Sequence, residues 1–234
     1  MDLSGKIASN EQLVARGNYN YQVSGKNSGL TESWSLHIVP DGSFIHRAEV
    51  KGVIAVLHLR QETLFVATAD YSPSRLEMTQ QIEDELTQST IRCYPESIEQ
   101  TISRETETNQ KIIETPAGYS LFFPPVSAQG FIVRRYDLER GGRQALPHVS
   151  VRIQPAGDLP LSVELQRIEF EHINSHEEIE TPAGQFTCHH FIRYDQHMEQ
   201  QLWLDESWLP IQWSVTYSPI MKWEYLLTRY YRER

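Results

Sequence analysis

The sequence predicts an all-β fold, in which one large antiparallel sheet is rolled into a half-barrel or a wide, incompletely closed barrel with one or two short helices. Apolar and polar side chains alternate along most of the chain, as they do in half-buried strands. Turn residues interrupt this alternation at short intervals, which is typical of antiparallel meanders. We therefore expect about twelve to fifteen strands. We also expect a single β-rich domain over residues 1–234, since no linker-like stretch divides the chain.

The first third of the chain gives the clearest strands. Residues 18–23 and 30–39 alternate between apolar and polar side chains. Between the second and third strands, Asp41 and Gly42 supply the positive φ that a tight reversal needs. The segment GVIAVLHL, residues 52–59, is apolar at nearly every position, which favours a central strand covered on both faces.

The middle of the chain is more polar. Residues 76–104 alternate weakly and are rich in threonine, which has a low helix propensity, so we expect strands that are exposed on one face. Residues 72–88 could alternatively form an irregular helical stripe, and residues 127–138 are the best candidate for a short helix. Alternation then returns and predicts strands over residues 148–153, 161–172, 185–195, 201–206, 210–218 and 222–231.

The hexapeptide IETPAG occurs twice, at residues 113–118 and 179–184. Its proline presets φ at about −65° and its glycine accepts the exit geometry of a turn. Each copy therefore predicts a hairpin, with a strand, a tight turn and a second strand. Similar blocks follow both copies, which suggests an internal pseudo-repeat over residues 113–151 and 179–215. Their unequal spacing excludes a strict solenoid or propeller. A structural role is favoured, because neither copy brings a nucleophile or a ligand cluster.

The charge and cysteine content limit the possible partners. With 21 basic and 31 acidic residues, the formal net charge is −10, so nucleic acid is not an expected partner. No apolar run is long enough for a transmembrane segment, and the N-terminus lacks the features of a secretory signal. We expect a soluble, cytoplasmic chain, unless a leader has been removed. Cys93 and Cys188 predict neither a disulfide framework nor a metal site, and no cofactor is expected.

One histidine-rich segment, CHHFIRYDQH, could carry chemistry. It places Cys188, His189, His190, Asp195 and His197 within ten residues. On a strand Cys188 and His190 share a face and could form a nucleophile and a base, with Asp195 as a further residue to test. A core cysteine beside a hydrogen-bonded histidine is the favoured interpretation, because no glycine-rich oxyanion loop accompanies the pair. No phosphate loop or dinucleotide-binding fingerprint occurs either.

Residues 179–234 contain a block that runs from the turn Thr181–Gly184 through a strand with Trp203 to a Leu-Pro pair, at Pro210, that opens the next strand. In this block the chain resembles a family of uncharacterised bacterial β proteins. That family is mostly periplasmic, and its fold is similar to the lipoprotein-carrier half-barrels, in which a curved antiparallel sheet wraps around apolar contents. The resemblance implies the half-barrel and leaves function open, because the family has no established catalytic residues. This chain departs from the family in lacking an export signal.

Aromatic residues crowd the last strands. We expect Trp203, Trp213, Trp223 and Tyr225 to lie on neighbouring strands, either as core or as the lining of a cavity. Core packing is the commoner arrangement, but a curved sheet needs contents for its concave face and a helix-poor chain supplies few. That shortage favours a cavity, which we expect these four residues and His190 to line.

Three functions remain open on this basis. The favoured one is a non-catalytic binding protein that holds an apolar or amphipathic small molecule, such as a lipid, in the aromatic-lined concavity. An alternative is an enzyme that acts in the same cavity through His190, Cys188 and Asp195. Another alternative is a scaffold or assembly factor, whose exposed sheet edge recruits a protein partner.

Overall fold

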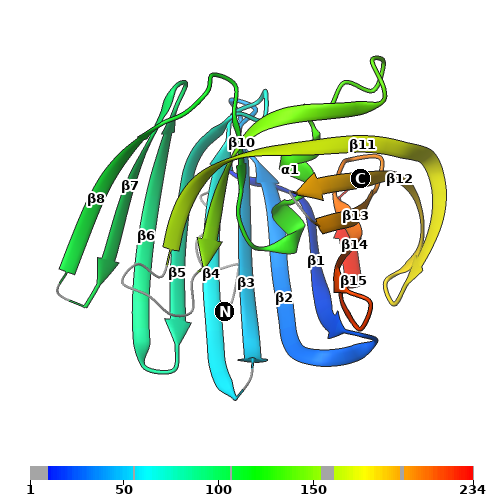
Figure 1. The fold of residues 1–234 in the computed structure, drawn as a ribbon, viewed down its shortest axis with the longest axis horizontal. Helices are drawn as coiled ribbons and strands as arrows, with labels where there is room; N and C mark the ends of the chain where they lie inside the picture. Colours follow the sequence, from blue (N-terminus) through cyan, green and yellow to red (C-terminus); the bar gives the residue numbers. More distant parts are fainter. Residues whose placement is uncertain (1–9, 55, 106, 154–160, 196–197, 234) are drawn as a thin grey trace.

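The computed structural model describes residues 10–54, 56–105, 107–153, 161–195 and 198–233, and every strand in these ranges belongs to one sheet (Figure 1). Two short helical segments, η1 (Val126–Ala128) and α1 (Gly130–Val133), lie between β9 (Ser120–Phe122) and β10 (Arg143–Ile153) in the chain. The predicted fold class is confirmed, because the sheet is large, mostly antiparallel and not closed. The strands are β1 (Gln12–Val23), β2 (Lys26–Ile38), β3 (Phe44–Ile54), β4 (Leu57–Ala67), β5 (Pro73–Ile82), β6 (Glu85–Tyr94), β7 (Ser97–Arg104), β8 (Glu107–Glu114), β9 (Ser120–Phe122), β10 (Arg143–Ile153), β11 (Leu161–Thr181), β12 (Gly184–Asp195), β13 (Met198–Leu204), β14 (Pro210–Ser218) and β15 (Met221–Arg232).

The order of the strands shows how the sheet is assembled. It runs β8-β7-β6-β5-β4-β3-β2-β1-β15-β14-β13-β12-β11-β10-β9, so two meanders meet where β1 pairs with β15. The pair β9–β10 is parallel, and every other pair in this order is antiparallel. β8 and β9 follow one another in the chain but lie at opposite edges of the sheet. The sheet curls until β10 and the first part of β11 lie over β3–β5 (Figure 1). Val149, Val151 and Val163 of these covering strands share a core cluster with Phe65 and Leu76.

Residues 52–59 do not form the central strand that their apolar sequence favoured. The described residues of this stretch, 52–54 and 56–59, form the end of the β3–β4 hairpin, where Val53, Val56 and Leu57 expose 39%, 86% and 46% of their surface. Gly52 has a φ of 147° and lies so close to Gly29 that a Cβ atom would be 1.9 Å from the Gly29 carbonyl oxygen. A continuous apolar run carries no alternation, so it could not distinguish an apolar hairpin end from a doubly covered strand.

The polar middle of the chain forms strands, as its weak alternation predicted. Residues 72–88 contribute to β5 and β6, so the helical alternative is wrong. The helix expected over residues 127–138 is reduced to η1 and α1, and no helix in the described ranges is long and apolar enough to span a membrane. At Gly130 a Cβ atom would lie 1.8 Å from the backbone oxygen of Trp208. A close backbone contact therefore decides the conformation here, and only glycine permits it.

The two IETPAG copies take different roles. The second is the predicted hairpin turn, because β11 ends at Thr181 and pairs there with Gly184, the first residue of β12. The first copy is not a hairpin, which corrects the expectation: it follows β8 at one edge of the sheet and leads to β9 at the other edge. The turn sequence fixes only the local reversal. The residues that follow determine which strand the chain pairs with next.

Residues 119–136, which we call the inner segment, enter the curve of the sheet and carry both helices. Val126 and Phe131 join a core cluster with residues of β1–β7. Ile132 and Val133 join a second cluster with residues of β10–β13. The inner segment therefore fills much of the concave face with the protein's own side chains.

A buried carboxylate fixes the inner segment to the sheet. Glu32 of β2 is fully buried, and its Oε2 accepts hydrogen bonds from the Tyr21 hydroxyl at 2.6 Å and the Val126 amide at 2.9 Å. Its Oε1 accepts a hydrogen bond from the Ser127 amide at 3.0 Å. Burial raises the pKa of the Glu32 carboxyl, and the hydrogen bonds oppose that rise. Since a buried carboxylate is tolerated only where donors satisfy it, Glu32 determines where η1 lies.

A buried histidine provides a second attachment. His46 of β3 is fully buried, and its Nε2 lies 2.8 Å from the Ser127 Oγ. Burial, with smaller contributions from His37 and Arg47, lowers the pKa of the His46 imidazole to about 3. The ring is therefore neutral at neutral pH, and its hydrogen bond to Ser127 needs no charge.

Replacing Glu32 by glutamine should destabilise the protein. A carboxamide offers one oxygen where two amides donate, so its NH2 group would face one of those donors. We expect Glu32→Gln to lower the free energy of unfolding, measured by urea denaturation, by about 2 kcal/mol. As a control, the exposed Glu114→Gln on β8 should change it by less than about 0.5 kcal/mol. Equal losses in the two variants would contradict the anchoring role of Glu32.

Stability should fall in acid because His46 must gain a proton on unfolding. Its pKa is about 3 in the folded chain against an ordinary value of 6.5. The contribution of His46 to the free energy of unfolding is therefore complete above pH 6.5 and is lost as the pH falls toward 3. In that window we expect this group to cost up to about 1.4 kcal/mol per pH unit in denaturation experiments. Ser127→Ala should lower the free energy of unfolding but leave its slope against pH unchanged. A slope that persists unchanged in His46→Gln would refute this assignment.

Candidate ligand-binding site

A pocket of about 420 Å³ remains where the inner segment does not fill the curve of the sheet. The inner segment contributes Phe122, Pro124 and Val126 to its wall, and strands β14 and β15 contribute Trp213 and Tyr225 on the other side. This volume lies within the range of sites that hold small organic molecules. The sheet thus has a concave face that is partly filled and partly open.

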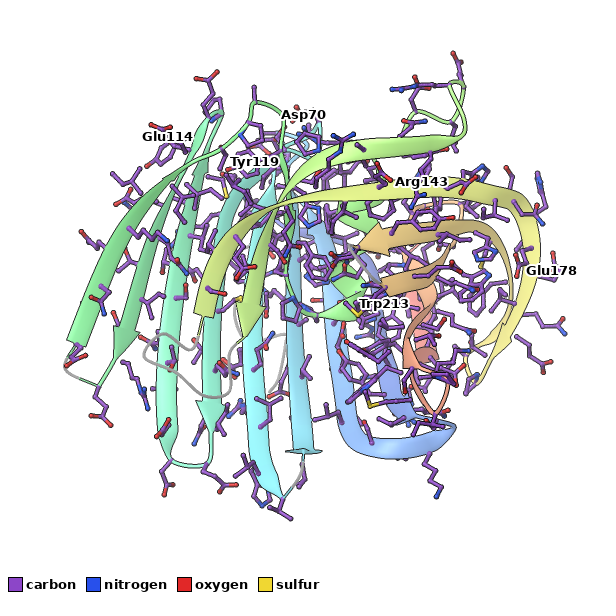
Figure 2. The ribbon with its side chains drawn as sticks, in the orientation of Figure 1. Asp70, Glu114, Tyr119, Arg143, Glu178 and Trp213 are labelled. Atoms are coloured by element: carbon purple, nitrogen blue, oxygen red, sulfur yellow. The ribbon has the colours of Figure 1, made fainter. Side chains whose placement is uncertain are left out.

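Side chains on one face of β14 form part of the aromatic wall of this pocket. Trp213, Val215 and Tyr217 occupy every second position and all line the pocket. Trp213 is opposite Tyr225 in the β14–β15 pair, and the two rings stack with their centroids 4.8 Å apart. Phe122 approaches Trp213 edge-on at 6.4 Å. Figure 2 shows Trp213 inside the curve of the sheet, whereas Glu178 lies on its outer bend.

Four polar side chains gather on the wall formed by β10, β12 and β13. Ser150, Arg193, Asp195 and Gln200 are exposed by 1%, 4%, 6% and 4%, and all line the pocket. Arg193 Nη2 lies 3.4 Å from the Asp195 Oδ2, and the guanidinium carbon lies 3.9 Å from the centre of the Phe122 ring. The pocket therefore combines an aromatic wall with a charged but balanced polar wall.

The structure brings two of the five expected ligand-binding residues to this pocket. Trp213 and Tyr225 line it, and Trp223 stacks on Tyr225 at 6.1 Å without lining it. His190 and Trp203 lie elsewhere and stack on each other at 4.6 Å.

Both side chains of this second pair bind one carboxylate. The Trp203 Nε1 donates to Glu177 Oε1 at 2.9 Å, and His190 Nδ1 lies 2.7 Å from Glu177 Oε2. They occupy the face of β12 and β13 opposite to Arg193 and Gln200, because side chains alternate along a strand. A part in ligand binding stays a prediction for these residues.

The residues suggested for catalysis do not converge. Cys188 is fully buried and its burial raises the thiol pKa to about 12. His190 is held by Glu177, and Asp195 faces the pocket from the other side of β12. His189 lines a separate hollow, and His197 lies outside the described residues. Within the described ranges no group of three potential ligands could hold a metal ion.

Several residues of the site were missed from the sequence. Ser150, Phe122 and Gln200 belong to segments without any distinctive motif. Asp195 was named from the sequence, but as a residue to test for catalysis. Arg193 was missed although it carried a signal, since it continues the inward-facing series that begins with the buried Phe191. Charged residues on the buried face of a predicted strand need partners, and this pattern could have identified them.

Comparison with models of known protein families gives no match, and no curated protein sequence matches the chain. Two solved structures are similar in fold. A β-barrel-like protein of the domain of unknown function DUF1849 from Brucella abortus has a TM-score of 0.58 and 8% identity, covering 95% of this chain and 98% of its own. A DUF1089 family protein from Pseudomonas aeruginosa has a TM-score of 0.51 and 12% identity, covering 81% of this chain and 90% of its own. These likenesses support the barrel-like fold alone.

The buried thiol of Cys188 should be unreactive in the folded protein. With a pKa of about 12, little thiolate is present at pH 8. In a Cys93→Ser variant, which leaves Cys188 as the remaining cysteine, we expect a thiol reagent to react about a thousandfold more slowly than with a free thiol. Denaturant should restore the full rate. Rapid modification of the native variant would revive Cys188 as a nucleophile.

Proposed function

We propose that this protein binds an apolar or amphipathic small molecule in the pocket between the inner segment and strands β12–β15. The observation that carries the proposal is the stacked pair Trp213 and Tyr225, which is left on the wall of an open pocket although the inner segment fills the neighbouring space. When a hydrocarbon covers an aromatic wall of this kind, the wall loses contact with water, and this loss lowers the free energy of the complex.

The partial filling of the concave face bears on this proposal. Had the protein's own chain occupied the whole concavity, no small molecule would have had room. Phe123 packs on Phe65 with ring centres 4.7 Å apart, and Phe131 packs on Phe65 at 5.1 Å, so the space near β4 is filled. Beside it, the pocket along β14 and β15 keeps about 420 Å³. The binding function is thus restricted to this part of the concavity.

The alternatives have less support. An enzyme using His190, Cys188 and Asp195 would need these groups to act together, and they face different surroundings. A scaffold function stays a prediction: β8 is an edge strand with nearly all of its residues exposed, but nothing about it selects a particular partner.

The neutral fluorescent probe N-phenyl-1-naphthylamine tests the proposal, because its emission rises when it enters an apolar site. We expect saturable binding to the native protein. Trp213→Ala should weaken that binding at least about tenfold, because it removes the main aromatic surface of the pocket. Val215→Phe should also weaken it, by occupying the space instead of removing a contact.

Tyr231→Ala is the matched control, since Tyr231 is a half-exposed aromatic residue on β15 that does not line the pocket. Its affinity for the probe should equal that of the native protein. Failure of the native protein to bind the probe, or equal weakening in the Trp213 and Tyr231 variants, would refute the proposal. Circular dichroism of each variant checks that the sheet is intact.

A further inference from the structure

The polar wall of the pocket contains two buried side-chain oxygens that lack a hydrogen-bond partner among the described residues. Neither the Ser150 Oγ nor the Gln200 Oε1 makes a hydrogen bond within the described part of the chain, although both side chains are more than nine-tenths buried. An unsatisfied buried polar atom destabilises the folded state and is uncommon in native proteins. Because both residues line the pocket, a molecule inside it could provide the missing hydrogen bonds.

Gln129, Arg193 and Asp195, which also line the pocket, are already engaged. Gln129 donates through its Nε2 to the backbone oxygens of Phe123 at 2.9 Å and Pro125 at 3.1 Å. Arg193 lies 3.4 Å from the Asp195 carboxylate and covers the ring of Phe122. The Ser150 Oγ and the Gln200 Oε1 are therefore the buried side-chain oxygens of the described lining that remain for a ligand.

The charges around the pocket disfavour a charged ligand. Arg193 and Asp195 are the charged residues of the described lining, and their charges balance. A carboxylate placed beside them would leave one buried negative charge without compensation, and an ammonium group would leave one positive charge.

A further carboxylate lies directly behind the wall. Glu32 accepts hydrogen bonds from the Tyr21 hydroxyl and the Val126 amide, and both of these residues line the pocket. When it is ionised, Glu32 adds a negative potential and makes an anionic ligand still less favourable. A neutral polar group adds no uncompensated buried charge, and the Glu32 carboxylate does not repel it.

We infer that the ligand is an uncharged amphiphile whose polar end both donates and accepts a hydrogen bond, such as a primary alcohol or a carboxamide. Its donor would meet the Gln200 Oε1, its acceptor would meet the Ser150 hydroxyl, and its hydrocarbon chain would lie against Trp213 and Tyr225. This inference rests on the proposed binding function and specifies the class of ligand.

A series of ten-carbon compounds tests the inference by displacement of N-phenyl-1-naphthylamine at pH 7. The series is decan-1-ol, decanamide, decanoate, decylammonium and decane, which share one chain length and differ at the end group. We expect decan-1-ol and decanamide to bind at least about tenfold more tightly than either charged compound. Decanoate that binds as tightly as decan-1-ol would overturn the inference.

The variant Gln200→Leu separates head-group recognition from general hydrophobic binding. Leucine keeps the volume of glutamine but removes the acceptor, so decan-1-ol should bind about tenfold more weakly while decane binds as before. Ser150→Ala should act in the same direction through the other group. Unchanged discrimination between decan-1-ol and decane in both variants would overturn the inference, and their urea denaturation curves check that the fold persists.

The outcomes separate the two proposals. If the probe and decane bind but the end group has no effect, the binding function survives and the inference about the ligand class fails. If neither the probe nor any compound of the series binds to the native protein, both fail.

Discussion

The arrangement of the interior depends on one buried carboxylate. Glu32 is the acceptor for two consecutive amides, those of Val126 and Ser127, at the start of η1. These bonds tie the inner segment to β2, although the two lie more than ninety residues apart in the chain. Without them the inner segment would keep its apolar side chains but lose the contact that fixes its position. The position of the pocket follows from that contact.

The pocket is the part of the concavity that the inner segment leaves open. Phe131 and its neighbours fill the space near β4, while Phe122 and Val126 form a wall that faces β14 and β15. The same residue, Glu32, thus fixes the filled part and contributes charge behind the open part. The walls of the open part come from the sheet: β14 and β15 supply Trp213 and Tyr225, and β12 supplies Arg193 with Asp195, whose charges balance.

The sequence was sufficient for the fold class, because alternation and turn residues report directly on an antiparallel sheet. It also placed Trp213 and Tyr225 on adjacent strands. It was insufficient wherever a distant contact decides the outcome. The first IETPAG copy connects opposite edges of the sheet, and no local property of a turn indicates which strand will follow.

Charged residues at positions where a strand faces the core were the main signal in the sequence that the prediction of strands from alternation did not use. Glu32 occupies the same face of β2 as the buried Leu30 and Trp34, at a position where an apolar residue is expected. Asp195 and Arg193 stand in the same relation to Phe191 on β12. Such positions indicate a carboxylate or guanidinium with partners, but they do not identify the partners, because these come from other parts of the chain.

The most direct test of the central claim, that the pocket beside the inner segment is the ligand site, is nuclear magnetic resonance of the isotope-labelled protein saturated with decan-1-ol. The account predicts nuclear Overhauser contacts from the alkyl chain to the rings of Trp213 and Tyr225, and from the hydroxymethylene protons to Ser150. Contacts confined to the separate hollow that is lined by His189 and Tyr230 would contradict it.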